Sequence, residues 1–95
     1  MISEPEPYEE TPLSEIPEPL IDPSLTIVRT RTVALLTGLK RSTISKYVQE
    51  DENFPRPVPL TDSAHRGAPV GFVLSEVQAW IKSRIAAREA RRAEQ

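Results

Sequence analysis

The sequence predicts a small α+β domain of three helices and a two-stranded hairpin, preceded by an acidic tail. Three observations support this fold class. Apolar residues recur at helical spacing in three segments, a proline-rich stretch lies between the second and third of them, and half of the acidic residues precede the first basic one. With 95 residues, the chain is long enough for one small domain with a thin core.

The first 24 residues are expected to form a disordered or extended tail. They contain seven acidic residues, six prolines and no lysine or arginine. Each proline removes a backbone donor and disfavours helix at the preceding residue. High charge with few large apolar groups leaves little burial to offset the entropy of ordering. We therefore predict a tail over residues 1–24 and a folded domain over residues 25–95. The tail groups available to fold against a partner are Leu13, Ile16, Leu20 and Ile21.

The net charge of −2 conceals a strong asymmetry along the chain. All twelve basic residues lie in residues 25–95 against seven acidic ones, which leaves a formal charge of +5 there and −7 in the tail. An acidic tail attached to a basic body suggests a nucleic-acid-binding protein. A domain with a charged surface and a solubilising tail has the same pattern, so charge alone leaves both interpretations open.

A glycine separates the first two predicted helices. The first begins at about residue 30, and its apolar residues recur at helical spacing. These apolar residues are Val33, Leu35, Leu36 and Leu39. Gly38 is expected to end this helix, because glycine adopts the left-handed C-terminal conformation without strain. Two helices joined by such a short turn form a helix-turn-helix.

The second predicted helix runs over about residues 40–51. Ile44, Tyr47 and Val48 share one side of it and are expected to face the core. The opposite side is then short polar or basic, with no carboxylate before Glu50. Its residues are Arg41, Ser42, Ser45, Lys46 and Gln49.

Prolines at 55, 57 and 59 exclude helix before the next element. Two short strands are predicted over residues 58–60 and 70–73, joined by a turn-rich loop. The third helix is expected to use Ser75 as its N-cap in a capping box with Gln78, and to continue to Ala93. Its predicted apolar stripe, with Trp80 as the largest buried side chain, is Val77, Trp80, Ile81 and Ile85.

This order of elements predicts a helix-turn-helix followed by a hairpin and a third helix. In a helix-turn-helix, the second helix enters the major groove of duplex DNA. The charge around the motif agrees with that role. Five basic residues and no acidic one occur between positions 29 and 46: Arg29, Arg31, Lys40, Arg41 and Lys46. Small helical domains also use glycine turns and polar exposed helices, so the local charge carries more weight than the turn itself.

Three segments, residues 31–47, 54–60 and 70–81, resemble the AlpA-like phage and prophage regulators in motif, order and spacing. The most specific parts are the Phe-Pro-x-Pro-Val stretch and the later Ser-Glu-Val-x-x-Trp-Ile. Lys40 stands where the family often has a serine helix cap, which adds a charge at the helix start. The resemblance implies a winged helix-turn-helix related to the MerR DNA-binding domain, and a role as a transcriptional regulator or an excisionase.

By this resemblance, residues 41–46 belong to the recognition helix and residues 65–67 to the wing. Together with the charge pattern, this yields nine candidate DNA-binding residues. They are Arg31, Lys40, Arg41, Ser42, Thr43, Ser45, Lys46, His65 and Arg66. The expected partner is double-stranded DNA, with side-by-side copies on repeated sites and a possible recombinase or transcription partner.

No catalytic, cofactor or metal site is predicted, so the chain is not expected to be an enzyme. His65 lacks the further histidines or cysteines that a metal site needs. Asp62, Ser63 and His65 are neighbours on one loop, whereas a nucleophilic triad needs residues converging on a rigid pocket. A transcriptional regulator, an excisionase-type DNA-bending factor and a protein-interaction adaptor remain as alternatives.

The expected location is the cytoplasm of a bacterial host cell. The chain has no cysteine, which fits a reducing compartment. It contains no long apolar run, and its acidic, proline-rich start is unlike a secretory signal.

Overall fold

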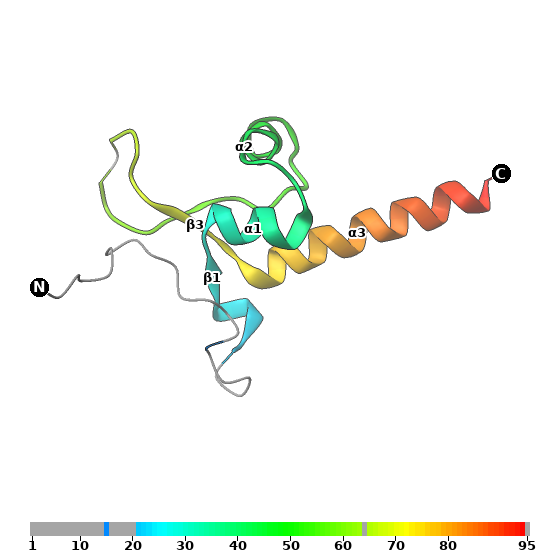
Figure 1. Cartoon of the computed structure of the whole chain (residues 1–95), viewed down its shortest axis with the longest axis horizontal. Helices are drawn as coiled ribbons and strands as arrows, with labels where there is room; N and C mark the ends of the chain where they lie inside the picture. The colour runs from blue at the N-terminus through cyan, green and yellow to red at the C-terminus, as the bar shows by residue number, and fades with distance from the viewer. Residues whose placement is uncertain (1–14, 16–20, 64, 95) are drawn as a thin grey trace, which may run out of the picture.

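The computed structural model describes residues 15, 21–63 and 65–94. The other residues, which include nearly all of the predicted tail, lie outside this description. The helical elements are the 3₁₀ helix η3 (Pro23–Leu25), α1 (Thr30–Thr37), α2 (Arg41–Glu50) and α3 (Leu74–Ala93). The strands are β1 (Ile27–Val28), β2 (Val58–Pro59) and β3 (Val70–Val73). Figure 1 shows α1 beside β3 and α2 next to α1, with α3 extending away to the C-terminus. The predicted α+β winged helix-turn-helix is confirmed.

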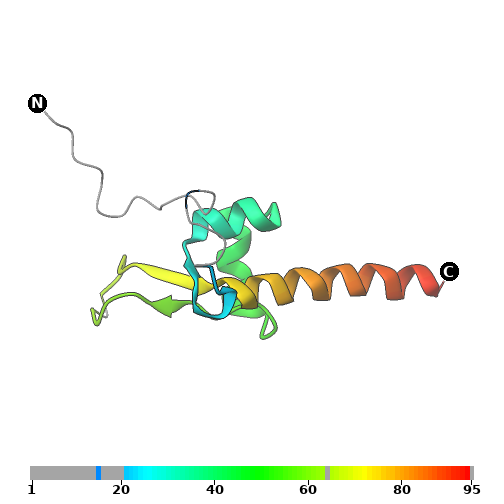
Figure 2. The ribbon, with the colours of Figure 1, turned by 90° about the horizontal axis from the view of Figure 1, so that it is seen from below.

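The sheet has three strands in the order β1-β3-β2, all antiparallel (Figure 2). Val58 of β2 pairs with Gly71, and this pairing with β3 forms the predicted hairpin. On the other edge of β3, Val28 of β1 pairs with Phe72. The sequence predicted only the two strands of the hairpin, so β1 adds a third strand to the two-stranded wing.

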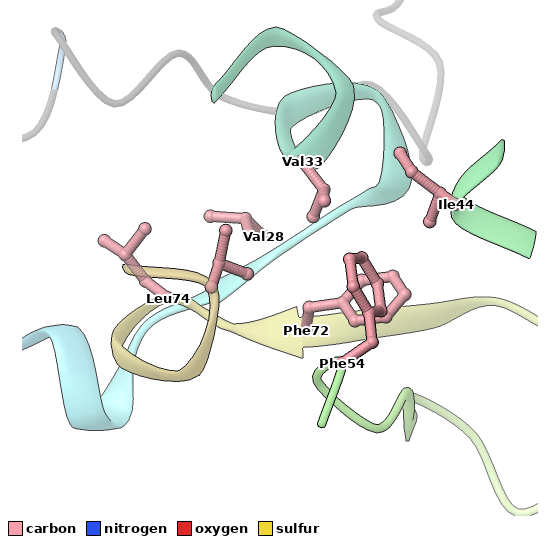
Figure 3. Close-up of a cluster of buried hydrophobic side chains, with 7 residues drawn as sticks. Val28, Val33, Ile44, Phe54, Phe72 and Leu74 are labelled. Carbon is pink, nitrogen blue, oxygen red and sulfur yellow. The ribbon is translucent and has the colours of Figure 1, made fainter. Parts of the chain in front are cut away.

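The core is built from seven buried side chains that come from both helical and extended segments. They are Val28, Val33, Ile44, Phe54, Phe72, Leu74 and Val77. In Figure 3, Val33 from α1 and Ile44 from α2 point toward the rings of Phe54 and Phe72. The core therefore joins both helices of the helix-turn-helix to the strand that carries the wing.

The start of α3 differs from the prediction. The capping box is wrong: α3 begins at Leu74, directly after β3, and Val73 at the N-cap makes no side-chain capping hydrogen bond. Instead, the backbone N–H of Leu74 donates to the carbonyl oxygen of Thr26 at 2.8 Å. Because the segment leading into β1 supplies this acceptor, one amide at the helix start is satisfied without Ser75.

Trp80 is less buried than predicted. The largest fully buried side chains are Phe54 and Phe72, each 2 % exposed, whereas Trp80 is half-buried at the edge of the core. Ile85, the last member of the predicted stripe, is 48 % exposed. The reason is visible in Figure 2, where the C-terminal half of α3 extends beyond the other described elements.

The segment before β1 is part of the packed structure. Ile21 lies against the core, and η3 lies against α3. Asp22 caps η3 by accepting hydrogen bonds from the backbone N–H and the hydroxyl of Ser24, at 3.0 and 2.7 Å. The predicted division at residue 25 stays a prediction, but packed residues occur on the tail side of it.

Candidate nucleic-acid interface

The turn between α1 and α2 is short and internally hydrogen-bonded. Gly38 ends α1 with φ 76°, and its N–H donates to the Ala34 carbonyl at 2.8 Å. The hydroxyl of Thr37 donates to the Val33 carbonyl at 2.7 Å and accepts from the N–H of Leu39 at 3.2 Å. The predicted role of Gly38 is confirmed, and the start of α2 is set relative to α1.

Helix α2 has one side in the core and the other in solvent. Ile44 is 1 % exposed, and Tyr47 and Val48 are half-buried against the core. All five residues of the predicted polar side are exposed, and the neighbouring Thr43 is partly exposed. We call Arg41, Ser42, Ser45 and Lys46 the outer face of α2.

The N-terminus of α2 is electropositive. Lys40 occupies the N-cap and makes no side-chain capping hydrogen bond. The first turn contains no acidic residue, and Arg41 adds a second positive charge. The helix dipole also places partial positive charge at this end. An anion such as a phosphate is favoured here, because basic side chains and backbone N–H groups lie together.

The loop after α2 is fixed by an arginine that sequence reasoning missed. The guanidinium of Arg56 donates to the carbonyl oxygens of Asp51 and Phe54, at 3.0 and 3.4 Å. Phe54 and Pro55 are buried beneath this loop. Arg56 thus holds the C-terminal end of α2 against the core, although its position between two prolines gave no local signal of that role.

The wing ends in a tight turn with an arginine at its corner. The hairpin continues beyond β2 through a hydrogen bond from the N–H of Leu60 to the Pro69 carbonyl at 3.0 Å. At the tip, the N–H of Ala68 donates to the His65 carbonyl at 3.2 Å, and Gly67 has φ 87°. A positive φ at the third position is the signature of a type II turn. Arg66 occupies the exposed second position of this turn.

The nine predicted residues lie on three surface segments. Eight are exposed and Thr43 is partly exposed. Arg31 lies in α1, residues 40–46 lie at the turn and on α2, and His65 and Arg66 lie in the wing. In Figure 1 the wing loop rises on the same side of β3 as α2. His65 Nδ1 lies 2.8 Å from the hydroxyl of Ser63, which holds the imidazole along the loop.

Other kinds of site have little support in the part of the chain that the structure describes. There, no three acidic, histidine or cysteine side chains gather into a possible metal site. Among the same residues, no helix has the length and apolar character needed to cross a membrane.

These features define the class: a small winged helix-turn-helix protein with a basic, exposed second helix. Residues 26–85 match the family described as prophage CP4-57 regulatory protein (AlpA), so the chain belongs to the AlpA family of prophage regulatory proteins. This confirms the resemblance found in the sequence. The family is regulatory rather than enzymatic. Comparison with curated proteins finds no match, and comparison with solved structures finds none either.

Proposed function

We propose that this protein binds duplex DNA sequence-specifically and regulates transcription of a phage or integrated element. The proposal rests on the difference in burial between the two sides of α2. Ile44 is buried, while basic and hydroxyl side chains on the N-terminal part of the helix stand in solvent. In helix-turn-helix proteins, this part of the second helix meets base edges in the major groove.

The proposed contacts fall into three groups. The outer face of α2 reads or grips the major groove, with Thr43 beside it. Arg31 and Lys40 contact phosphates, where they position the protein without reading sequence. Arg66 contacts the backbone or the minor groove from the wing tip, with His65 next to it.

The test begins with selection of bound sequences from a random DNA pool, followed by titration of single variants on the selected site. Arg41→Ala and Lys46→Ala should each weaken binding by about 1–3 kcal/mol if they make base contacts, which is roughly five- to 160-fold. Arg66→Ala should lower the dependence of log K on log salt by about 0.9 if one phosphate contact is lost. Arg92→Ala removes the same charge from the exposed end of α3 and serves as the matched control. Unchanged affinity in both α2 variants contradicts the proposal.

The small size of the domain bears on how it occupies DNA. A single small module buries only about 600–1,000 Å² of protein surface on DNA. We therefore propose that copies bind side by side on repeated sites. Nuclease footprints should extend over several adjacent repeats, and monomer-sized footprints on every site contradict this arrangement.

The same selection distinguishes the other functions expected from the sequence. Sites at promoters support the transcriptional role. Sites beside attachment sequences, with bent DNA in the complex, support an excisionase role that would involve a recombinase partner. An adaptor function requires a specific protein partner together with no salt-sensitive DNA affinity. The proposed location is the cytoplasm of a bacterial host.

A further inference from the structure

Gln49 lies on the exposed side of α2, next to the outer face but not part of it. Its side chain makes no hydrogen bond or ion pair with another described residue. The buried Ile44 marks the direction of the core. At about 100° per residue around the axis, Ser42 and Lys46 lie about 20° from the opposite direction, and Gln49 lies about 40° from it. These side chains therefore form one ridge that faces away from the core.

The ridge ends where the chain becomes acidic. Glu50 is the last residue of α2, and Asp51 and Glu52 follow it. Carboxylates repel the phosphates of DNA, whereas the carboxamide of Gln49 carries no charge. The Asp51 carboxylate is directed back to its own loop, where it accepts a hydrogen bond from the N–H of Asn53 at 2.9 Å. Gln49 is therefore the last residue of α2 that can approach DNA without bringing a negative charge to the phosphates.

The carboxamide of Gln49 suits a base edge better than a phosphate. It presents a donor N–H beside an acceptor oxygen, and because it is uncharged it gains little from the phosphate backbone. Of the four bases, only adenine presents an acceptor, N7, next to a donor, N6, in the major groove. Guanine offers two acceptors there, and each pyrimidine offers one polar group. Two hydrogen bonds at once are therefore available to a glutamine only on adenine.

We propose that Gln49 reads an adenine in the major groove and is a specificity-determining residue of α2. This role rests on the proposed function, because α2 must lie in the groove. Lys46 and Gln49 are about 4.5 Å apart along the helix axis at 1.5 Å per residue, and successive base pairs are about 3.4 Å apart. The adenine therefore lies beside the base pair that Lys46 contacts. Arg41, about 12 Å from Gln49 along α2, lies at the other end of the contacts.

Selection from a random DNA pool, carried out with the full-length wild type and two variants, provides the test. The wild type should require adenine at one position beside the Lys46 contact. Gln49→Ala should accept all four bases there, losing a discrimination of about five- to 160-fold, while the rest of the selected site stays unchanged. Gln49→Glu should prefer cytosine at the same position, because a carboxylate accepts from the N4 group of cytosine but cannot donate to N7 of adenine.

Gln78 provides the matched control, because it is another exposed glutamine within a helix, on α3 rather than on α2. Gln78→Ala and Gln78→Glu should both select the wild-type site. Lys46→Ala should change affinity or preference at its own position and leave the adenine position unchanged. Thermal unfolding followed by circular dichroism should show every variant folded at the temperature of the selection, since all three positions are exposed.

The outcomes separate this role of Gln49 from the proposed function itself. If the wild type selects a site and Gln49→Ala selects the same site with the same preference at every position, Gln49 does not read a base, although the protein still binds DNA specifically. A uniform loss of affinity at all bases identifies a backbone contact and overturns the role as well. So does a preference for a base other than adenine at the position that responds to Gln49. A wild type that selects no sequence overturns both proposals.

Discussion

Replacing Gly71 by alanine should destabilise the domain by roughly 1–3 kcal/mol, the usual range for forcing an extra carbon into a packed site. Gly71 lies on the central strand β3, where it pairs with Val58 of β2. A Cβ added there would collide with Cγ2 of Ile27 and would lie 3.2 Å from the carbonyl oxygen of Val28. Both atoms belong to β1, so the substitution pushes this edge strand away from the sheet.

The two collisions differ in how easily they are relieved. Ile27 is 41 % exposed and can move its side chain, whereas the Val28 carbonyl belongs to the strand backbone. We therefore expect a loss near the middle of the range. For a domain of this size, each kcal/mol corresponds to about 4–8 °C in Tm.

A double-mutant cycle tests this reasoning. Ile27→Ala removes the colliding Cγ2 atom, so Gly71→Ala should cost about 1 kcal/mol less in that background than in the wild type. Urea denaturation followed by circular dichroism and by Trp80 fluorescence provides the four free energies of unfolding. The single Ile27→Ala variant is the matched control. Strictly additive losses would refute the collision as the cause.

Substitutions at three further positions probe the turn, the start of the fold and the core. Gly38→Ala should lower the free energy of unfolding by about 1 kcal/mol, measured by thermal unfolding. The cause is the left-handed φ alone, since no atom lies within 4 Å of the added Cβ. Gly38→Asn should recover part of this loss, because asparagine tolerates the left-handed conformation better than alanine. Hydrogen bonds from the Ser24 hydroxyl and, second, from its backbone N–H lower the pKa of Asp22. The ionised Asp22 therefore stabilises the fold at pH values above its usual pKa, and this stabilisation is lost as the pH falls through the lowered pKa. Ser24→Ala should raise the midpoint of the Asp22 titration by NMR, and an unchanged midpoint counts against the bond. Phe54→Ala should cost about 3–5 kcal/mol, measured by urea denaturation, and a loss below about 1 kcal/mol would contradict its central place.

The parts of the fold that sequence predicted are those set by local periodicity. The spacing of Ile44, Tyr47 and Val48 assigned the buried side of α2, and Gly38 marked the end of α1. Both rest on interactions within a few residues. The outer face of α2 could then be predicted as well, because the residues opposite the apolar side of an amphipathic helix face solvent.

The parts that sequence missed depend on contacts between distant residues. Ser75 followed by Gln78 has the form of a capping box, but the carbonyl of Thr26 reaches the first amide of α3 from the strand edge. No local pattern reveals an acceptor 48 residues earlier in the chain. Likewise, β1 is only two residues long, and its pairing with β3 has no sequence signature.

Burial along α3 shows a second limit of sequence patterns. The stripe containing Val77, Trp80, Ile81 and Ile85 has helical spacing throughout, yet burial declines along it from 1 % exposure at Val77 to 48 % at Ile85. Periodicity shows which residues share a side of a helix, but not where the facing elements end. The exposed end of that stripe lines a groove between α1 and α3.

The aromatic cluster links the two parts of the proposed DNA interface. The ring of Phe54 lies 5.7 Å from that of Tyr47 on α2, 6.3 Å from that of Phe72 on β3, and 5.1 Å from that of Trp80 on α3. Tyr47 follows the outer face directly on α2, and Phe72 lies on the strand that leads out of the wing. The position of α2 relative to the wing is therefore set by packing around one ring in a loop. The Phe54 ring contacts aromatic side chains of both α2 and β3, although Phe54 itself lies in the loop between them. The relative position of the residues proposed to contact DNA therefore depends on a buried side chain that does not itself contact DNA.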